Sequence, residues 1–232
     1  MFVLFIFQNN LSYYNLLQTH SLNLGDVMND NQNLNKLHKE KMLKTKAIKN
    51  KILKSKNIKK GLIIVHTGNG KGKSSSGFGM IMRCIAHGIP CAVVQFIKGS
   101  WQTGEKKILK GKFSKECVFF VSGDGFTWDT QDRQNDIKSA NKGWEKAKEL
   151  IRDPKIRFVL LDEINIALKY GYLDIGEVVE FLKNDKPSST HVVLTGRSAK
   201  TELLNISDLV TEMKLIKHPF NKGVKAQPGI EF

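Results

Sequence analysis

Short apolar runs alternate with longer segments of helical periodicity from Gly61 to the end of the chain. The runs are rich in Val, Ile, Leu and Phe, which is typical of buried strands. They are Leu62–His66, Ala92–Ile97, Val118–Ser122, Phe158–Asp162, Val192–Thr195 and Leu209–Glu212. Helical segments are predicted at Lys73–His87, Gln131–Arg152, Ile175–Asn184 and Lys200–Asn205. This alternation predicts an α/β fold with a mostly parallel sheet covered by helices on both faces.

The segment 29–60 has a different pattern, because it is polar, rich in lysine and free of Gly and Pro. Its apolar residues recur at roughly helical spacing, which predicts a basic amphipathic helix or arm. Of the net charge of +15, residues 1–60 carry +8, from eleven lysines against three acidic residues. Such an arm could contact nucleic acid or an anionic ligand, or it could be a solvated lysine face.

The first 28 residues do not resemble a targeting signal. The opening "MFVLFIFQNN" is apolar for only seven residues and has neither a basic lead-in nor a small-residue cleavage site. We interpret 1–28 as a disordered leader or a start-site overextension, 29–60 as the arm, and 61–232 as one nucleotide-binding domain. The three cysteines form no C-x-x-C pair, which argues against a zinc site and indicates a reducing, cytoplasmic location.

The stretch "TGNGKGKSS" lies between the first predicted strand and the first predicted helix, where phosphate-binding loops occur. The usual spacing G-x-x-x-x-G-K-[ST] would place its first glycine at position 67, where this chain has Thr67. Lys73 would supply a charge for phosphate and Ser74 a hydroxyl for Mg²⁺. The residues expected to hold the nucleotide here are Gly68, Asn69, Gly70, Lys71, Gly72, Lys73, Ser74 and Ser75.

Other strand ends carry further candidate residues, and in an open parallel sheet ligands bind at these ends. Asp162 and Glu163 close the strand "FVLLDE", where an acid would stand near Mg²⁺. Phe126 and Trp128 lie in "GDGFTWDTQD", where they either anchor a loop to the core or face a large flat ligand. Basic residues that could reach phosphate, ribose or base are Arg83, Lys98 and Arg197, each of which could equally be a surface residue.

These motifs together resemble the P-loop type of ATP:corrinoid adenosyltransferase. The resemblance rests on "TGNGKGKSS", "VVQFIKG", "GFTWDTQ", "LLDEINIAL", "LTGR" and the tail "KHPFNKGVKAQPGIEF", and covers about residues 36–232. It implies a RecA-like P-loop fold. It also implies transfer of the 5′-deoxyadenosyl group of ATP to the Co(I) of a reduced corrinoid, with release of tripolyphosphate. Nucleotide laid on the loop in the reversed sense would account for Thr67 in place of glycine.

The resemblance also implies roles for particular residues. Lys73 would stabilise the leaving triphosphate, and Ser74 and Asp162 would hold Mg²⁺, which Mn²⁺ can replace. Phe126 and Trp128 would press on the lower face of the corrinoid, leaving a four-coordinate Co(II) that is easier to reduce. Glu163 and Arg197 fall near metal and nucleotide. The implied partners are an electron-donating flavoprotein and a second copy of the chain in a homodimer, with no nucleic acid and no membrane.

Two other functions remain open at this level. A RecA-like ATPase stimulated by nucleic acid would use Glu163 to orient water and the lysine arm to bind the polymer. A nucleotide-binding regulator would use the arm to dock on a partner. Both leave the altered loop and "GFTWDTQ" unexplained, so the transferase is the favoured hypothesis.

Overall fold

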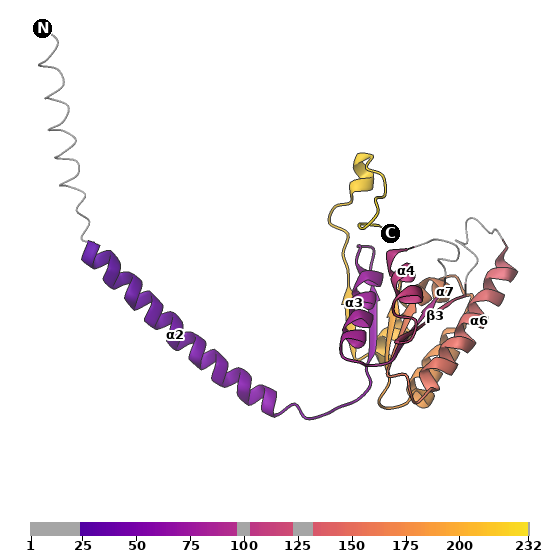
Figure 1. Cartoon of the computed structure of the whole chain (residues 1–232), viewed down its shortest axis with the longest axis horizontal. Helices are drawn as coiled ribbons and strands as arrows, with labels where there is room; N and C mark the ends of the chain where they lie inside the picture. The colour runs from indigo at the N-terminus through magenta and orange to yellow at the C-terminus, as the bar shows by residue number, and fades with distance from the viewer. Residues whose placement is uncertain (1–23, 97–102, 123–131, 232) are drawn as a thin grey trace, which may run out of the picture. The chain divides into compact units, whose positions relative to one another are not determined.

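The computed structural model describes residues 24–96, 103–122 and 132–231, with side chains described from residue 32 onward. The chain forms two units, 1–58 and 59–232. The first unit contains the helix α2, Leu24–Lys54. The second contains all the strands, drawn from magenta to yellow in Figure 1. The sequence-based boundary at residue 61 lies close to this division.

Helix α2 confirms the prediction of a basic helical arm, although it begins before residue 29. Its apolar side chains stay exposed: Leu34, Leu37, Ile48 and Ile52 are each more than half exposed. Lysines fill most of the positions between them. Within the described part of the chain, no helix is both long and apolar enough to cross a membrane. The interpretation of 1–28 as a leader stays a prediction.

Unit two is built on one parallel sheet of six strands in the order β3-β2-β4-β5-β1-β6. The strands are β1 (Ile63–Thr67), β2 (Cys91–Gln95), β3 (Cys117–Val121), β4 (Phe158–Asp162), β5 (His191–Thr195) and β6 (Leu209–Glu212). The register pairs Gln95 of β2 with Asp162 of β4, and His66 of β1 with Thr195 of β5. The carboxyl ends of four central strands therefore meet at one edge of the sheet.

Alternate residues of each central strand enter different cores, because successive side chains of a strand point to opposite faces. Val65, Val94 and Leu161 belong to one apolar cluster, and Ile64, Val93 and Leu160 belong to the other. The first cluster is covered by α6 (Arg133–Arg152), α7 (Ile164–Lys169), α8 (Ile175–Glu180) and α9 (Thr201–Ile206). The second is covered by α3 (Lys73–Ala86) and α4 (Gly104–Gly111). Figure 1 shows α3 and α6 on opposite sides of the sheet. The doubly covered α/β fold is confirmed.

All six predicted strands are present, with ends that differ by no more than two residues. Two helices were not predicted, α4 and α7, because each is short, with eight and six residues. The segment predicted as one helix over Ile175–Asn184 instead combines α8 with a π-helical turn, Phe181–Asp185. A further short 3₁₀ helix, Pro219–Lys222, lies in the tail after β6.

Candidate functional site

The loop 68–72 connects β1 to α3 and depends on glycine at two positions. Gly72 precedes α3 with φ of 102°, in the left-handed region that side chains rarely adopt. A Cβ on Gly70 would lie 2.7 Å from the carbonyl oxygens of Met213 and Lys214. The Gly70 amide instead donates to the Met213 carbonyl at 2.6 Å. The chain after β6 therefore supports the loop from behind and fixes its shape.

Thr67 stands where a standard phosphate-binding loop begins with glycine, and the structure gives it two contacts. Its carbonyl accepts a hydrogen bond from the Met213 amide at 2.8 Å. Its hydroxyl oxygen accepts one from the Ala199 amide at 3.1 Å, which ties the loop to the turn after β5. Thr67 is thus the last residue of strand β1 rather than part of the turn, and a glycine would lack the hydroxyl contact.

A cavity of about 440 Å³ opens above the loop, within the range of ordinary small-ligand sites. Lys73 begins α3 at its floor and is 7% exposed, with its ammonium group donating to the Gly70 carbonyl at 2.5 Å. Eight predicted residues line this cavity: Gly70, Lys71, Gly72, Lys73, Ser74, Ser75, Glu163 and Arg197. The loop amides and the amino end of α3 also favour a bound anion. The described part of the cavity is therefore suited to polyphosphate.

Asp162 is fully buried at the end of β4, and both of its carboxylate oxygens accept hydrogen bonds. Thr195 of β5 donates to Oδ1 at 2.8 Å, and the Gln95 side-chain amide of β2 donates to Oδ2 at 2.9 Å. Asp162 is not among the residues that line the cavity, whereas Gln95 is. The carboxylate predicted to hold metal is thus fixed in a row of polar side chains across three strands.

Glu163 follows Asp162 in a left-handed conformation, with φ of 63°. Non-glycine residues in this region are uncommon and concentrate at functional sites. Its amide donates to the Thr195 hydroxyl oxygen at 3.0 Å. A Cβ on Gly196 would lie 3.2 Å from the Glu163 carboxylate, so glycine there leaves room for that group beside Arg197. The turn after β5 and the turn after β4 thus present Glu163 and Arg197 together.

His66 lies one residue before Thr67 and is 2% exposed. Burial lowers the pKa of His66, and a hydrogen bond with the Lys73 backbone acts in the opposite direction. Its Nδ1 atom has no hydrogen-bond partner among the described residues. His66 is therefore a buried residue of the core that lies beside the start of α3.

The C-terminal tail returns to the phosphate-binding loop. Glu231 forms an ion pair with Lys71, and Ile230 and Ala226 also line the cavity. A turn at Gln227 shapes this end, with its carbonyl accepting from the amides of Ile230 and Glu231 at 3.1 and 3.0 Å. The tail therefore forms one wall of the cavity, a role that its position in the sequence does not indicate.

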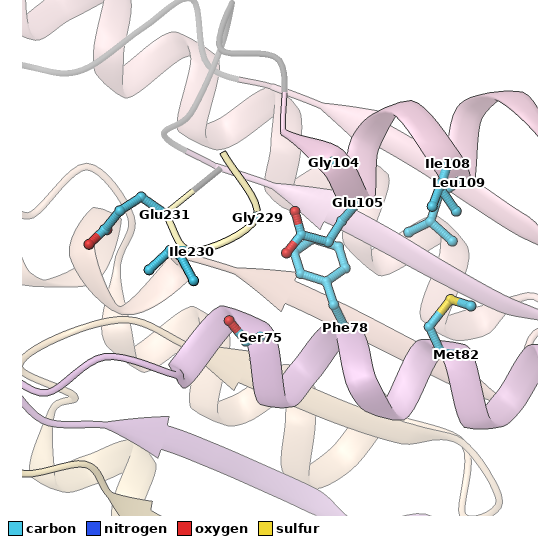
Figure 2. A pocket seen from close by; sticks show the side chains of 10 residues that line it. All are labelled: Ser75, Phe78, Met82, Gly104, Glu105, Ile108, Leu109, Gly229, Ile230 and Glu231. Carbon is cyan, nitrogen blue, oxygen red and sulfur yellow. The ribbon is translucent and has the colours of Figure 1, made fainter. Parts of the chain in front are cut away.

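An apolar groove of about 390 Å³ adjoins the cavity between α3 and α4. Figure 2 shows Phe78 and Met82 of α3 directed toward α4, with Ile230 and Glu231 beside Ser75. Ser75, Phe78, Glu105, Ile230 and Glu231 line both spaces, so the two are continuous. A ligand with a polyphosphate end and an apolar end can thus find matching surfaces side by side.

Some predicted site residues do not line the cavity. Gly68 and Asn69 shape the start of the loop without lining it. Arg83 lies ten residues along α3 from Lys73 and is exposed. At 1.5 Å per residue, Arg83 lies about 15 Å along the helix from Lys73. Its position in this chain therefore does not support the prediction that it contacts a nucleotide bound at the loop of the same chain. Lys98, Phe126 and Trp128 lie outside the described residues.

The cavity lining carries charges of both signs. Among the described residues, no three His, Cys, Asp or Glu side chains are grouped closely enough to hold a metal ion on their own. Lys71, Lys73 and Arg197 face three carboxylates, those of Glu105, Glu163 and Glu231. Three carboxylates would repel a bare triphosphate, whereas a divalent cation would be attracted to the carboxylates and to the triphosphate. Hard cations such as Mg²⁺ take oxygen ligands, and Ser74 and the carboxylates supply them. The described residues therefore fit a nucleotide that enters with its metal.

Among the described residues lining this cavity there is no cysteine or histidine. Cys91 and Cys117 are the first residues of β2 and β3, at the opposite edge of the sheet, and both are buried. Burial raises the pKa of the Cys84 thiol to about 11, which keeps it protonated. Within the described lining of the cavity, no Cys or His side chain is therefore placed to form a covalent intermediate.

Comparison with known proteins gives consistent matches. A family model described as ATP:corrinoid adenosyltransferase BtuR/CobO/CobP matches residues 59–232. A corrinoid adenosyltransferase of Sinorhizobium sp. is 62% identical over 195 residues, covering 84% of this chain and 91% of the relative. One from Pseudomonas aeruginosa is 45% identical over 205 residues, covering 88% and 100%. The solved KaiC-like protein PH0186 of Pyrococcus horikoshii aligns with a TM-score of 0.40 at 14% identity, over 68% of this chain and 75% of that one, a similarity too low to bear on function.

Proposed function

The chain belongs to the ATP:corrinoid adenosyltransferase family, and from this premise we propose how its site performs the reaction. It is an enzyme that transfers the adenosyl group of ATP to a corrinoid. The observation that carries the proposal is that the polar cavity at the loop and the apolar groove beside α4 are continuous. Among the described residues lining them there is no cysteine or histidine that could act as a nucleophile.

The loop holds the triphosphate of ATP. The amides of 70–74 surround the phosphates, and the Lys73 ammonium group exchanges the Gly70 carbonyl for a phosphate oxygen. Lys71 exchanges Glu231 for phosphate in the same way. Arg197 adds a third positive charge from the turn after β5. Because triphosphate leaves in this reaction, these groups stabilise charge that increases in the transition state.

Mg²⁺ is the cation that we assign to the three-carboxylate cavity, and Mn²⁺ can replace it. Ser74 supplies a hydroxyl oxygen from the first turn of α3, and Glu163 a carboxylate from the turn after β4. Asp162 is buried behind them and acts through water, because both of its oxygens already accept hydrogen bonds. When bound, the ion neutralises part of the charge on the leaving triphosphate.

The transfer step needs orientation more than proton chemistry. The electron pair of Co(I) forms the cobalt–carbon bond to the ribose C5′ carbon. The C5′–oxygen bond breaks, and its electron pair leaves on tripolyphosphate. The protein's task is to hold C5′ in line between cobalt and the leaving oxygen, with the triphosphate fixed by the loop. Phe126 and Trp128 act on the lower face of the corrinoid before this step.

The remaining assignments rest on the family resemblance. Co(II) corrinoid receives one electron from a reduced flavoprotein. The enzyme is a homodimer in the cytoplasm. It acts in adenosylcobalamin synthesis or salvage.

One assay tests the proposed function against its two alternatives. The full-length enzyme is incubated with Mg-ATP and a corrinoid under strong reductant, while the absorption of the cobalt–carbon bond and the phosphate products are followed. We expect tripolyphosphate in equal amount to the adenosylated corrinoid, and none without reduced corrinoid. ADP released on addition of nucleic acid would instead indicate an ATPase, and absence of any turnover would indicate a regulator.

Replacing Glu231 by glutamine is expected to tighten ATP binding by about two- to fivefold. Without the ion pair to Glu231, Lys71 gives up no charged partner when it binds phosphate. The factor is small since exposed ion pairs contribute about 0–1 kcal/mol, and the Lys71 side chain is 55% exposed. Titration calorimetry with Mg-ATP measures the change. Glu145→Gln is the matched control, because Glu145 pairs with Lys148 on α6. Weaker binding in Glu231→Gln would mean that this carboxylate helps to hold the metal–nucleotide complex.

A further inference from the structure

Gln95 is an uncharged polar residue of the site that lies in the stretch "VVQFIKG" but has no role implied by the sequence. It is the last residue of β2, its side chain is fully buried, and it lines the cavity together with Lys73, Ser74 and Glu163. The register places it directly beside Asp162. Its amide group therefore lies between the buried carboxylate on one side and the ligand cavity on the other.

The orientation of this amide is fixed by chemistry. The Gln95 NH₂ group faces Asp162 and donates to its Oδ2 atom at 2.9 Å. The Oε1 atom is consequently turned the other way. Within the described residues Oε1 is buried and has no hydrogen-bond partner. A buried acceptor without a donor costs free energy, and native structures contain few of them.

A molecule bound in the cavity can supply a donor that the described residues do not. The phosphate groups of ATP offer acceptors rather than donors at neutral pH, so they cannot satisfy Oε1. Water bound to a divalent cation is a strong donor because the cation polarises it, and Mg²⁺ usually keeps several of its waters. Each oxygen of Asp162 retains a second lone pair, so the carboxylate and the Gln95 carbonyl can present two acceptors side by side.

We propose that Gln95 is a positioning residue for the hydrated metal of the bound nucleotide, with Oε1 accepting a hydrogen bond from a water molecule on Mg²⁺. A neutral amide suits this position for two reasons. A glutamate would place a second negative charge beside the buried Asp162. An amide also cannot remove a proton from the water that it orients, so that water stays a metal ligand and does not attack the triphosphate.

The test measures metal binding without the transfer reaction. Mn²⁺ is titrated into the full-length enzyme saturated with ATP in the absence of corrinoid, and the free Mn²⁺ is followed by electron paramagnetic resonance. Gln95→Met keeps the length of the side chain and removes the acceptor, so we expect Mn²⁺ affinity to fall by about 10- to 100-fold, as for other partners of metal-bound groups.

Thr195→Val is the matched control. Thr195 is equally buried and donates the other side-chain hydrogen bond to Asp162, but it is not among the residues lining the cavity. Its hydroxyl oxygen also accepts from the Glu163 amide, so its loss should lower thermal stability and Mn²⁺ affinity, the affinity by less than in Gln95→Met. Equal losses in Thr195→Val and Gln95→Met would overturn the proposal, because Gln95 would then only support Asp162. Unchanged affinity in Gln95→Met would overturn it as well.

A second arm distinguishes a ribose hydroxyl as the donor. ATP and its 2′- and 3′-deoxy forms are bound with EDTA present. If Gln95→Met weakens metal-free ATP but not one of the deoxy forms, the donor is the ribose and the metal assignment fails. The inference rests on the proposed metal–nucleotide site. Because the titration contains no corrinoid, a result that contradicts the role of Gln95 is distinguishable from failure of the transfer reaction.

Discussion

Replacing Lys73 by alanine is expected to slow adenosylation by about 10²- to 10³-fold, the usual effect of removing one group that stabilises transition-state charge. Lys73 is the most buried cation of the cavity, and its ammonium group already lies within the loop, 2.5 Å from the Gly70 carbonyl. In that low-dielectric position, the attraction between the Lys73 ammonium group and the triphosphate oxygens is weakly screened. The rate is measured under saturating ATP and chemically reduced corrinoid, so that reduction is not limiting.

Lys186→Ala is the control for loss of stability. Lys186 is also partly buried and donates to the carbonyls of Gly61, Pro187 and Thr190 at 2.9–3.1 Å. These residues precede β1 and β5, so they lie at the sheet edge opposite the cavity. Lys186→Ala should lower the melting temperature with little change in the rate per folded enzyme. If Lys73→Ala retained more than about a tenth of the wild-type rate, Lys73 would not be the main charge on the leaving group.

Replacing Trp128 by alanine is expected to slow the reaction far more when the corrinoid is supplied as Co(II) than when it is supplied as Co(I). The difference should be on the order of tenfold or more, since a tenfold change in rate requires only about 1.4 kcal/mol at the barrier. The proposed aromatic contact removes the lower axial ligand and makes Co(II) easier to reduce. Once Co(I) is present, that contribution is no longer needed. Both assays use the same enzyme, ATP and corrinoid.

Trp128→Phe is the matched variant, because it keeps an aromatic face of smaller area. It should retain most of the rate in the Co(II) assay. Phe126→Ala should behave like Trp128→Ala, with the loss concentrated in the Co(II) assay. Equal losses from both cobalt states in Trp128→Ala would mean that the aromatic residue only supports the fold.

Local sequence patterns specified much of the site. The apolar run followed by glycines and Lys73 correctly predicted a loop between a strand and a helix, since each of these features acts over a few residues. Glu163 and Arg197 were expected at strand ends, and the parallel sheet brings both to the cavity. Thr67 was recognised as a departure from the standard loop. Only the fold shows that its hydroxyl oxygen accepts from the Ala199 amide.

Other members of the site depend on contacts between distant parts of the chain. Gln95 and Asp162 are 67 residues apart and meet because β2 pairs with β4. Lys71 and Glu231 are 160 residues apart and meet because the tail returns to the loop. The glutamine and the glutamate both lie in stretches that carry the family resemblance, but no local pattern places either of them in the cavity. Arg83 shows the converse, since its place in the sequence near the loop becomes a distance of about 15 Å along α3.

The sequence by itself determined the elements, the doubly covered sheet and the phosphate-binding loop, because hydrophobic periodicity and backbone freedom act between near neighbours. The tertiary structure decided which side chains share the cavity. Strand order placed Gln95 beside Asp162, and the supporting chain after β6 fixed the loop at Gly70. Sheet pairing and tail docking join residues without regard to their separation in the chain, so the composition of the site, its charge balance and its unpaired acceptor emerge only once the chain is folded.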